Sequence, residues 1–448
     1  MVELATKPKV LLFSSMDGDF APMIASNFVR EGCVVEALCK AEHVLACSSA
    51  VARWFRYSFT RPLHSLRRAV VSSRPDLIVC SDDAARHTLT RLHRSSVNND
   101  SIASREMAAL IARSLGNPEY FVLAEEKSRL LEMLKGTEVR MPRSIAVPNA
   151  EALEDICRTL TFPLVLKRDR TFGGQGVIIC RNHNEVVRGY RRLTSPPTLR
   201  DSLRELVRKG DFHAVENYFF PSTPVIVAQA YVEGRPANRA VGCWSGEVIA
   251  ALTVVALKTD RDDVTCPATV VEIARNAEID RTAALIVKRL GLSGICGFDF
   301  VIESSTGLPY FLELNPRATP TCFLGQAVDS DICKALRHAV GGNPQQARCI
   351  AVSHGEITGP IALFPGELRR DPNSSYVVSG YHAAPWEDPL VLEKVFGQLQ
   401  RFAIEHGYDS GHLQRLLADR GIQAVISPQA EAHTFRGLTG RLWSVLNR

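Results

Sequence analysis

The feature that most constrains this chain is a pair of short apolar segments, each interrupted by one acidic residue. Asp299 lies between two phenylalanines in residues 297–302, and Glu313 lies between two leucines in residues 310–314. A turn-forming Ser-Ser-Thr-Gly-Leu segment at 304–308 separates them, so the pattern predicts a β-hairpin. Acidic groups among large apolar neighbours need a cation or a polar partner to compensate for their desolvation. The hairpin therefore predicts a site as well as a fold element.

Two further residues extend the predicted site. Glu313 and Asn315 are two positions apart, so their side chains share one face of a strand, and Asp299 on the facing strand can pair near them. Two carboxylates and an amide oxygen are hard oxygen ligands, suited to Mg²⁺ that bridges phosphates. Arg317 shares this face if the strand continues past Pro316. The alternative is a salt bridge between Glu313 and Arg317 on a solvated face.

A second motif combines a lysine with a glycine-rich loop. Lys167 ends the predicted strand 164–167, and the loop leads into the predicted strand 177–180. Glycines let backbone N–H groups turn toward an anion, and a lysine supplies a point charge for phosphate oxygens. The lysine precedes the glycines and no helix follows, unlike the G-x-x-x-x-G-K-[ST] loop, so a flexible hairpin with a surface lysine is the alternative. The candidate loop residues are Thr171, Gly173, Gly174, Gln175 and Gly176.

A third motif follows the predicted strand 225–229. The strand leads into polar residues and ends at Gly234. Such a strand end can present backbone N–H and C=O groups to the edge of an adenine, although many strand ends without a ligand look the same. The candidate residues are Gln229, Ala230, Tyr231, Val232 and Glu233.

The N-terminal segment alternates predicted strands with predicted helices. The strands are 10–13, 34–38 and 75–80, and the helices are 21–30 and 66–71. This alternation predicts an open parallel sheet of Rossmann-like topology. The turn after the first strand lacks G-x-G-x-x-G, which disfavours a nicotinamide or flavin dinucleotide. Asp82 and Asp83 follow the third strand, where they either meet a ligand or cap the next helix.

The rest of the chain is a β-rich region followed by a segment of different character. Predicted strands cover 240–244 and 248–255, and predicted helices cover 123–134, 152–160 and 281–290. Near the end, the predicted elements are strands at 360–364 and 422–426 and helices at 391–406 and 412–420.

Composition excludes several other classes of protein. The 12 cysteines include no C-x-x-C pair and no Cys/His cluster with zinc-ligand spacing, as is typical of reduced thiols in a cytosolic protein. The net charge of +5 is not gathered into one dominant basic run, which argues against nucleic-acid binding. No apolar stretch reaches about 18 residues and no signal-peptide pattern is present, so we expect a cytoplasmic protein without membrane contact.

The three motifs, in this order, resemble the ATP-grasp superfamily of carboxylate–amine and carboxylate–thiol ligases, including carbamoyl-phosphate-synthetase-like ATP-binding domains. The pair F-D-F and F-L-E-L-N-P-R is the most specific element. The resemblance implies an α/β protein in which a Rossmann-like domain precedes a two-lobed fold whose α+β lobes clamp ATP. The implied domains are 1–116 (Rossmann-like), 117–341 (ATP-grasp, with a lid lobe at about 162–230) and 342–448, a small α/β C-terminal extension of unknown role.

The resemblance also implies roles for individual residues. Lys127 and Lys167 contact the phosphates, the loop 171–176 closes over them, and Gln229 meets the adenine amino group while the backbone after it offers further contacts.

The hairpin residues take the metal and the substrate in the same comparison. Asp299, Glu313 and Asn315 hold one or two Mg²⁺ (or Mn²⁺) ions. Arg317 holds the substrate carboxylate or the transferring phosphoryl group and, with Lys167, is the implied catalytic residue.

One position departs from the family pattern. Many relatives carry an acid shortly after the hinge glycine to hold the ribose, but Pro236 occupies that position here. Glu233 and Asn238 are the candidate replacements.

The implied function is that of an ATP-dependent carboxylate–amine ligase that forms ADP and phosphate. Such an enzyme activates a carboxylate as an acyl phosphate and transfers it to an amine, here an amino acid or a peptide-like acceptor. The alternatives are a bicarbonate-using carboxylase or carbamoyl-phosphate-type enzyme, and a non-catalytic nucleotide-binding protein on the same fold. The expected partners are small-molecule carboxylate and amine substrates, and a homodimer stays open.

Overall fold

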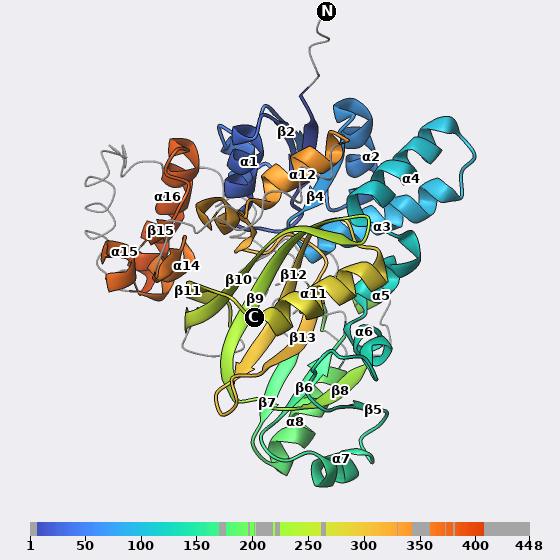
Figure 1. The fold of residues 1–448 in the computed structure, drawn as a ribbon, viewed down its shortest axis with the longest axis vertical. Coiled ribbons are helices and arrows are strands. Elements are labelled where there is room, and N and C mark those ends of the chain that lie inside the picture. The colour runs from blue at the N-terminus through green and yellow to red at the C-terminus, as the bar shows by residue number, and fades with distance from the viewer. Residues whose placement is uncertain are drawn as a thin grey trace, which may run out of the picture.

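A computed structural model describes residues 7–169, 176–195, 198–200, 202, 218–219, 225–260, 266–328, 330–342, 359–371, 373–379 and 381–406. These residues form a parallel sheet of four strands, a sheet of seven strands and an antiparallel sheet of four strands. Figure 1 shows the parallel sheet at one end, the seven-stranded sheet in the centre and the small antiparallel sheet at the other end. The arrangement confirms the predicted α/β fold with a Rossmann-like N-terminal part.

The N-terminal sheet is parallel throughout, with strand order β3-β2-β1-β4. Its strands are β1 (Lys9–Phe13), β2 (Val34–Cys39), β3 (Arg53–Arg56) and β4 (Leu77–Cys80). Its helices are α1 (Ala21–Arg30), η1 (Val44–Cys47), α2 (Pro62–Ser73), α3 (Asp83–Val97) and α4 (Ile102–Leu115). Leu12 packs with Ile24 of α1 on one face, and Leu11 packs with Leu66 of α2 on the other. Because helices cover both faces, β1 after Lys9 is a continuous apolar run.

Four of these elements, β3, η1, α3 and α4, were not predicted. β3 is an edge strand in which only Phe55 is buried, so it shows no clear apolar run. α3 and α4 are rich in polar residues, but each begins at a capping side chain. Asp82 accepts a hydrogen bond from the Ala85 backbone N–H, and Ser101 accepts one from the Ser104 N–H. The cap interpretation of Asp82 is therefore confirmed.

The seven-stranded sheet has the order β13-β12-β9-β10-β11-β14-β15. Its strands are β9 (Gly234–Trp244), β10 (Glu247–Thr259), β11 (Ala268–Ala274), β12 (Gly294–Glu303), β13 (Pro309–Asn315), β14 (Ile361–Leu363) and β15 (Tyr381–Ala383). On one face, α11 (Ala277–Leu290) contributes Ile286, which packs with Val241. On the other, α12 (Ile332–Val340) contributes Ile332, which packs with Ala240, and η4 (Cys322–Val328) lies before α12. Neighbouring residues of β9 thus face opposite layers, as the pleat of a strand requires.

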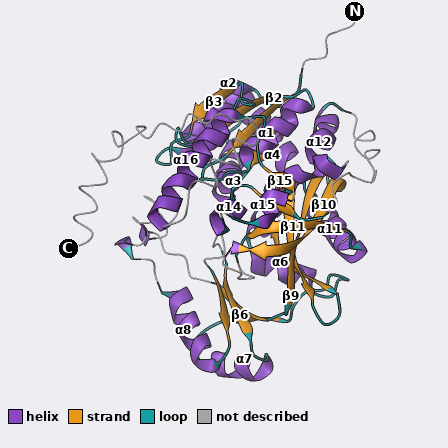
Figure 2. Ribbon diagram, turned by 90° about the vertical axis from the view of Figure 1, so that its left-hand side faces the viewer, coloured by secondary structure: helices purple, strands orange, loops and turns teal. Residues whose placement is uncertain are grey.

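The small antiparallel sheet has the order β5-β8-β6-β7. Its strands are β5 (Ser144–Val147), β6 (Leu164–Arg168), β7 (Val177–Cys180) and β8 (Ile226–Ala230). Leu164 and Leu166 face a core formed with α7 (Leu153–Thr159) and α8 (His183–Thr194), which cover one side of the sheet. Figure 2 shows these two helices at the end of the molecule farthest from the parallel sheet.

The connection from the parallel sheet to the small antiparallel sheet differs from the predicted single helix at 123–134. It contains η2 (Pro118–Tyr120), α5 (Phe121–Glu125) and α6 (Lys127–Leu134). The helix is broken at Glu126, whose backbone is extended, with φ −101° and ψ 93°. The first turn of α6 bonds instead to the end of β6, because Ser128 donates to the carboxylate of Asp169.

The C-terminal part docks on the N-terminal part. It contains α14 (Gly366–Arg370), α15 (Ser375–Ser379) and α16 (Pro389–His406). Asp388 is buried before α16 and accepts hydrogen bonds from Ser48 Oγ at 2.6 Å and Ser49 N at 3.0 Å. These bonds attach the start of α16 to the segment that follows η1. The predicted helix 412–420 and strand 422–426 lie outside the described residues.

Two expectations from composition concern the whole chain. The cysteines of the described residues are free thiols, most of them buried. Among the same residues, no helix combines the length and apolar character needed to cross a membrane.

Candidate active site

The predicted hairpin is formed by β12 and β13, and it brings the acidic residues together. Asp299 pairs directly with Glu313, and Gly297 pairs with Asn315. The residues between them on each strand, including Phe298, lie in the core under α11. The polar side chains therefore point to the opposite face of the sheet.

A short segment after the hairpin packs closely against this face. A Cβ atom at Gly297 would lie 2.2 Å from Thr319 Cγ2, so only glycine fits there. Thr321 Oγ1 donates to Asn238 Oδ1 at 2.6 Å, and Asn238 Nδ2 donates to Asp299 Oδ1 at 2.6 Å. Asn238, which sequence reasoning considered only for the ribose, is thus a direct partner of Asp299.

The carboxylate of Asp299 is only partly compensated by the groups around it. The pKa of Asp299 is raised to about 6, first by burial and then by the negative charge of Glu313. Hydrogen bonds from Asn238 and Asn315 and the charge of Arg317 act in the other direction. Asn315 Nδ2 lies 2.7 Å from Asp299 Oδ2 and 3.5 Å from Glu313 Oε1. The amide N–H groups of Asn238 and Asn315 supply only partial positive charge to the carboxylates. The oxygen atoms of Asp299, Glu313 and Asn315 therefore form a ligand set that fits a hard cation.

Arg317 lies beside this cluster but not on the strand, because β13 ends at Asn315. Its Nε lies 2.9 Å from Asp83 Oδ2, at the first residue of α3. Its Nη2 donates to Asn315 Oδ1 at 3.4 Å and its Nη1 to Ala318 O at 3.2 Å. Burial acts to lower the pKa of Arg317, but the carboxylates of Asp83, Asp82 and Asp299 together raise it. The ion pair links the hairpin to the N-terminal sheet, a contact that the sequence did not predict.

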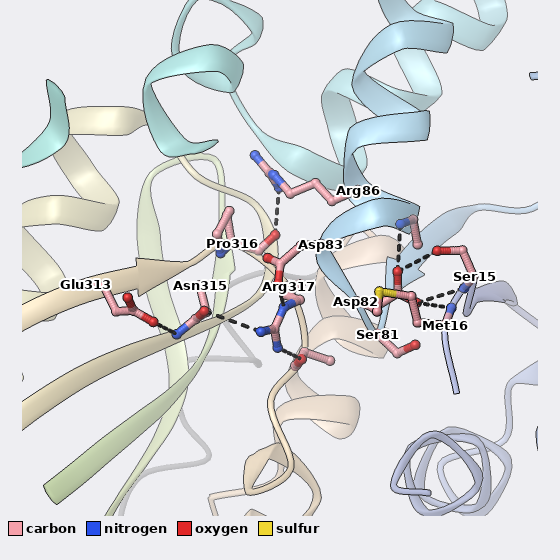
Figure 3. A network of polar contacts seen from close by, with 12 residues as sticks. Ser15, Met16, Ser81, Asp82, Asp83, Arg86, Glu313, Asn315, Pro316 and Arg317 are labelled. Atoms are coloured by element: carbon pink, nitrogen blue, oxygen red, sulfur yellow. Dashed lines mark hydrogen bonds and ion pairs between the residues drawn. The ribbon is translucent and has the colours of Figure 1, made fainter. Parts of the chain in front are cut away.

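The carboxyl edge of the parallel sheet holds the other end of this network (Figure 3). Asp82 accepts hydrogen bonds from Ser15 Oγ at 2.6 Å, Ser15 N at 2.7 Å and Met16 N at 3.2 Å, besides capping α3. Burial raises its pKa against the effect of these bonds. Asp82 therefore fixes the loop after β1 to the start of α3, while the adjacent Asp83 faces Arg317.

A serine–histidine pair at the same edge has a structural role. Ser14 Oγ and His43 Nε2 are 3.0 Å apart, and His43 Nδ1 accepts a hydrogen bond from Leu45 N at 3.0 Å. Because Nδ1 is an acceptor, the proton of the neutral ring is on Nε2, which therefore donates to Ser14. The pKa of His43 is lowered to about 4, chiefly by burial. This tautomer cannot take a proton from Ser14, so the pair is not an activated nucleophile.

Two predicted nucleotide-binding residues lie together on the small antiparallel sheet. Lys167 and Gln229 share the face opposite the one covered by α7 and α8, because Val165 pairs with Gln229 and Lys167 with Val227. Gln229 is buried, and its Nε2 donates to Ser144 Oγ at 3.0 Å.

The glycine-rich loop falls mostly outside the described residues, as do Thr171, Gly173, Gly174 and Gln175. Gly176 is described, and its carbonyl accepts from Arg168 N at 2.9 Å. Lys127 opens α6, but its side chain is also outside the described part. The bonds between Ser128 and Asp169 nevertheless place the start of α6 beside the strand that carries Lys167.

The hinge between β8 and β9 is tied to the body of the protein at both ends. Ala230 N donates to Arg143 O at 2.8 Å, and Glu233 O accepts from Ser304 N at 2.9 Å. The backbone N–H of Ala230 is therefore bonded within the protein and is not a donor to a base. Tyr231 and Val232 lie in the connection between β8 and β9.

A family model and several curated proteins match the segment that contains these features. Residues 205–321 match the model of the ATP-grasp domain. The carbamoyl phosphate synthase large chain of Pasteurella multocida (strain Pm70) is 24% identical over 252 residues, which cover 54% of this chain and 21% of that protein. The corresponding chain of Helicobacter pylori (strain ATCC 700392 / 26695) is 23% identical over 238 residues, covering 52% and 20%.

The chain is similar to the ATP-grasp superfamily, and residues 205–321 carry the match to its domain model. It spans about a fifth of the length of the carbamoyl phosphate synthase large chains that it matches.

Solved structures share the ATP-grasp fold at low sequence identity. The biotin carboxylase domain of Hydrogenobacter thermophilus 2-oxoglutarate carboxylase, a dimer in complex with MgADP, ADP and bicarbonate, has a TM-score of 0.53 and 16% identity, covering 75% of this chain and 69% of that one. An L-amino acid ligase from Bacillus licheniformis has a TM-score of 0.51 and 17% identity, covering 75% and 76%.

The ATP-grasp match contains the hairpin cluster and Gln229, whereas Lys127 and Lys167 precede it. Sequence reasoning missed Asp83 as the partner of Arg317 and Asn238 as the partner of Asp299. The position of Asp83 after a predicted strand was one signal, since the carboxyl ends of parallel strands are common ligand positions.

Proposed function

We propose that this ATP-grasp protein is an ATP-dependent ligase that phosphorylates a carboxylate and transfers the acyl group to an amine. The observation that carries the proposal is the opposed pair of Asp299 and Glu313, with Asn315 and Arg317 within hydrogen-bonding reach of one another. This arrangement places metal-type ligands and a cationic side chain at one point, as transfer of a phosphoryl group to an anion requires.

Asp299, Glu313 and Asn315 are the proposed ligands of one or two Mg²⁺ ions. The raised pKa of Asp299 supports this role, because burial and then the charge of Glu313 disfavour its negative charge, which a bound cation would compensate. Mg²⁺ bound there would supply positive charge against the phosphates of ATP. The amide of Asn315 would turn its oxygen toward the ion, since its nitrogen faces both carboxylates in the structure.

The shared face of the small sheet is the proposed site of the nucleotide. Gln229 directs its amide nitrogen at Ser144, which leaves its carbonyl oxygen to accept a hydrogen bond from the adenine amino group. Val232, in the hinge that follows, would contact the base through its backbone. Lys167, on the same face as Gln229, would contact the phosphates, together with Lys127 and the loop 171–176.

Arg317 is the proposed anchor of the acid substrate. A carboxylate oxygen attacks the γ-phosphorus, the bond to the β-phosphate oxygen breaks, and ADP leaves. An amine then attacks the acyl carbon, a C–N bond forms, and phosphate leaves with the C–O bond electrons, while the amine gives up a proton. Because two anions meet in the first step, the charge of Arg317 lowers the barrier by holding the carboxylate in line.

Bicarbonate is the second candidate for the acid. The relatives named as carbamoyl phosphate synthases and the neighbouring structure that contains bicarbonate favour it. The same residues would then phosphorylate bicarbonate in place of an organic carboxylate. A homodimer, the state named for that neighbouring structure, is proposed for this chain as well.

The test is phosphate release from ATP, measured with each amino acid, with small organic acids and with bicarbonate in turn. We expect release that requires Mg²⁺ and is stimulated by one class of acid. Glu313→Gln should abolish the stimulated rate, whereas the control Glu303→Gln, at the far end of the same hairpin, should retain it. Equal rates for the parent and Glu313→Gln would contradict the metal assignment, and stimulation by bicarbonate alone would select the second candidate.

A further inference from the structure

The first turn of α3 contacts the residues that follow the hairpin of β12 and β13. Asp83 and Arg86 are three positions apart, so they lie on one face of the helix. Asp83 forms the ion pair with Arg317, and Arg86 Nη1 donates to the carbonyl of Pro316 at 2.8 Å. We propose that Asp83 and Arg86 are positioning residues that set the place of the Arg317 guanidinium, an inference that rests on the substrate-binding role proposed for Arg317.

The burial of Arg86 is the stronger of the two observations that support this proposal. Its side chain is only 1% exposed, and its Nε and Nη2 atoms have no hydrogen-bond partner among the described residues. The ring of Phe121 lies 5.8 Å from its guanidinium carbon. Burying a cation with unsatisfied N–H groups is unfavourable, and an apolar side chain of similar volume would stabilise such a place at least as well. Arg86 donates its hydrogen bond to the carbonyl of Pro316. We therefore infer that Arg86 sets the position of the segment that follows β13.

The local sequence explains why residues 316–318 depend on contacts outside the sheet. Pro316 has no backbone N–H, so it cannot extend the ladder of β13, and the chain leaves the sheet there. Three consecutive residues then bond to the N-terminal domain. Pro316 O accepts from Arg86, Arg317 pairs with Asp83, and Ala318 N donates to Cys80 O at 2.9 Å. Figure 3 shows Arg86 and Asp83 meeting this segment from α3 while Asn315 meets it from the strand.

The consequence concerns the reaction more than the fold. Arg317 forms an ion pair with Asp83, with Nε 2.9 Å from Oδ2, while its Nη2 lies beside Asn315 at the proposed metal site. A displacement of this group of about 1 Å would misplace the acid substrate and slow the reaction by about 100-fold. We expect binding of ATP, whose proposed site is on the small antiparallel sheet, to depend little on this contact.

The kinetic experiment compares Arg86→Met, Arg86→Lys and Asp83→Asn with matched controls on exposed residues near the end of α3, Arg94→Met and Asp100→Asn. The acid is the one that most stimulates phosphate release by the parent. For Arg86→Met and Asp83→Asn we expect kcat/KM for that acid to fall about 10- to 100-fold, with KM for MgATP within about twofold of the parent. Arg86→Lys, which can restore a donor to Pro316, should recover part of the loss, and the controls should match the parent.

A second background separates positioning from a general loss of structure. In Arg317→Lys, the added change Asp83→Asn should cause little further loss, because the residue that it positions is already altered. Full additivity of the two changes would overturn the inference, as would a parent-like kcat/KM in both Arg86→Met and Asp83→Asn.

Crystal structures of the parent and Arg86→Met give a readout that needs no activity. We expect the Arg317 side chain to move away from Asn315 in the variant. An unchanged Arg317 would overturn the positioning role even if the enzyme is a ligase. Absence of stimulated phosphate release in the parent would instead overturn the proposed function, and the two structures would still test where Arg86 places Arg317.

Discussion

Replacement of Asp299 by asparagine is expected to stabilise the metal-free protein while it removes a proposed metal ligand. The pKa of Asp299 is raised from the ordinary 3.8 to about 6, so the folded state disfavours the charged carboxylate near neutral pH. The group therefore contributes most to stability below pH 3.8, and that contribution is lost as the pH rises through about 6. Asparagine has no charge to bury and keeps nearly the same shape.

The size of the effect follows from the shift and from the hydrogen bonds. The rise of the Asp299 pKa from 3.8 to about 6 corresponds to about 3 kcal/mol, and partial exposure of the side chain reduces this to about 2 kcal/mol. The bond from Asn315 Nδ2 to Asp299 Oδ2 would be lost or re-formed with the amide turned, at a cost of about 1 kcal/mol. We therefore expect Asp299→Asn to raise the free energy of unfolding by about 1 kcal/mol near pH 7.

The assay is urea denaturation of both proteins in EDTA and in excess Mg²⁺, at about pH 7.5 and about pH 4. The advantage of the variant should be present at the higher pH and absent at the lower one. Mg²⁺ should stabilise the parent and not the variant, because it binds the folded parent alone. Asp100→Asn, at an exposed position, is the control for loss of one negative charge. A variant less stable than the parent at both pH values, or an equal response of both to Mg²⁺, would refute the reasoning.

Three further predictions concern separate parts of the molecule. The pKa of His43 is lowered to about 4 by burial, Lys40 and Lys394, so its neutral form contributes about 3 kcal/mol that is lost as the pH falls from 6.5 to about 4. His43→Asn should flatten the stability profile over this window, and an unchanged slope would count against the buried neutral ring. Asp388→Ala should leave the donors Ser48 Oγ and Ser49 N without this acceptor and weaken the docking of α16 by about 1–3 kcal/mol. Amide hydrogen exchange in α16 should become faster, and unchanged exchange would mean that this contact does not hold the helix. Gln229→Leu should raise KM for ATP about 5- to 10-fold and lower discrimination against GTP, because one hydrogen bond to the adenine amino group is lost. An unchanged ratio of kcat/KM for ATP to kcat/KM for GTP would mean that Gln229 does not contact the base.

Local pattern was enough to predict the hairpin. The alternation of apolar and acidic residues indicated which side chains share a face, and the Ser-Ser-Thr-Gly turn indicated which strands pair. Asp299 could therefore be placed near Glu313, and the structure pairs the two directly. The parallel N-terminal sheet was predictable for a related reason, because strands covered on both faces are apolar at successive positions.

Contacts between distant segments could not be read in this way. Asp83 and Arg317 are 234 positions apart and meet only because the segment after Pro316 packs on the parallel sheet. Asn238 stands in the middle of β9, where its link to Asp299 depends on the register of three strands. The break at Glu126 likewise arises from tertiary contacts, since Ser128 bonds to Asp169 at the end of β6.

The transfer of a phosphoryl group from ATP to a carboxylate is the central claim, and an oxygen-isotope experiment tests it most directly. The stimulating acid is prepared with ¹⁸O in its carboxylate, and the phosphate released from MgATP is analysed by mass spectrometry. Formation of an acyl phosphate predicts that the carboxylate oxygen appears in the released phosphate, since amine attack at the acyl carbon leaves that oxygen on phosphorus. Phosphate without ¹⁸O from the acid, together with incorporation of oxygen from labelled water, would contradict the proposed activation.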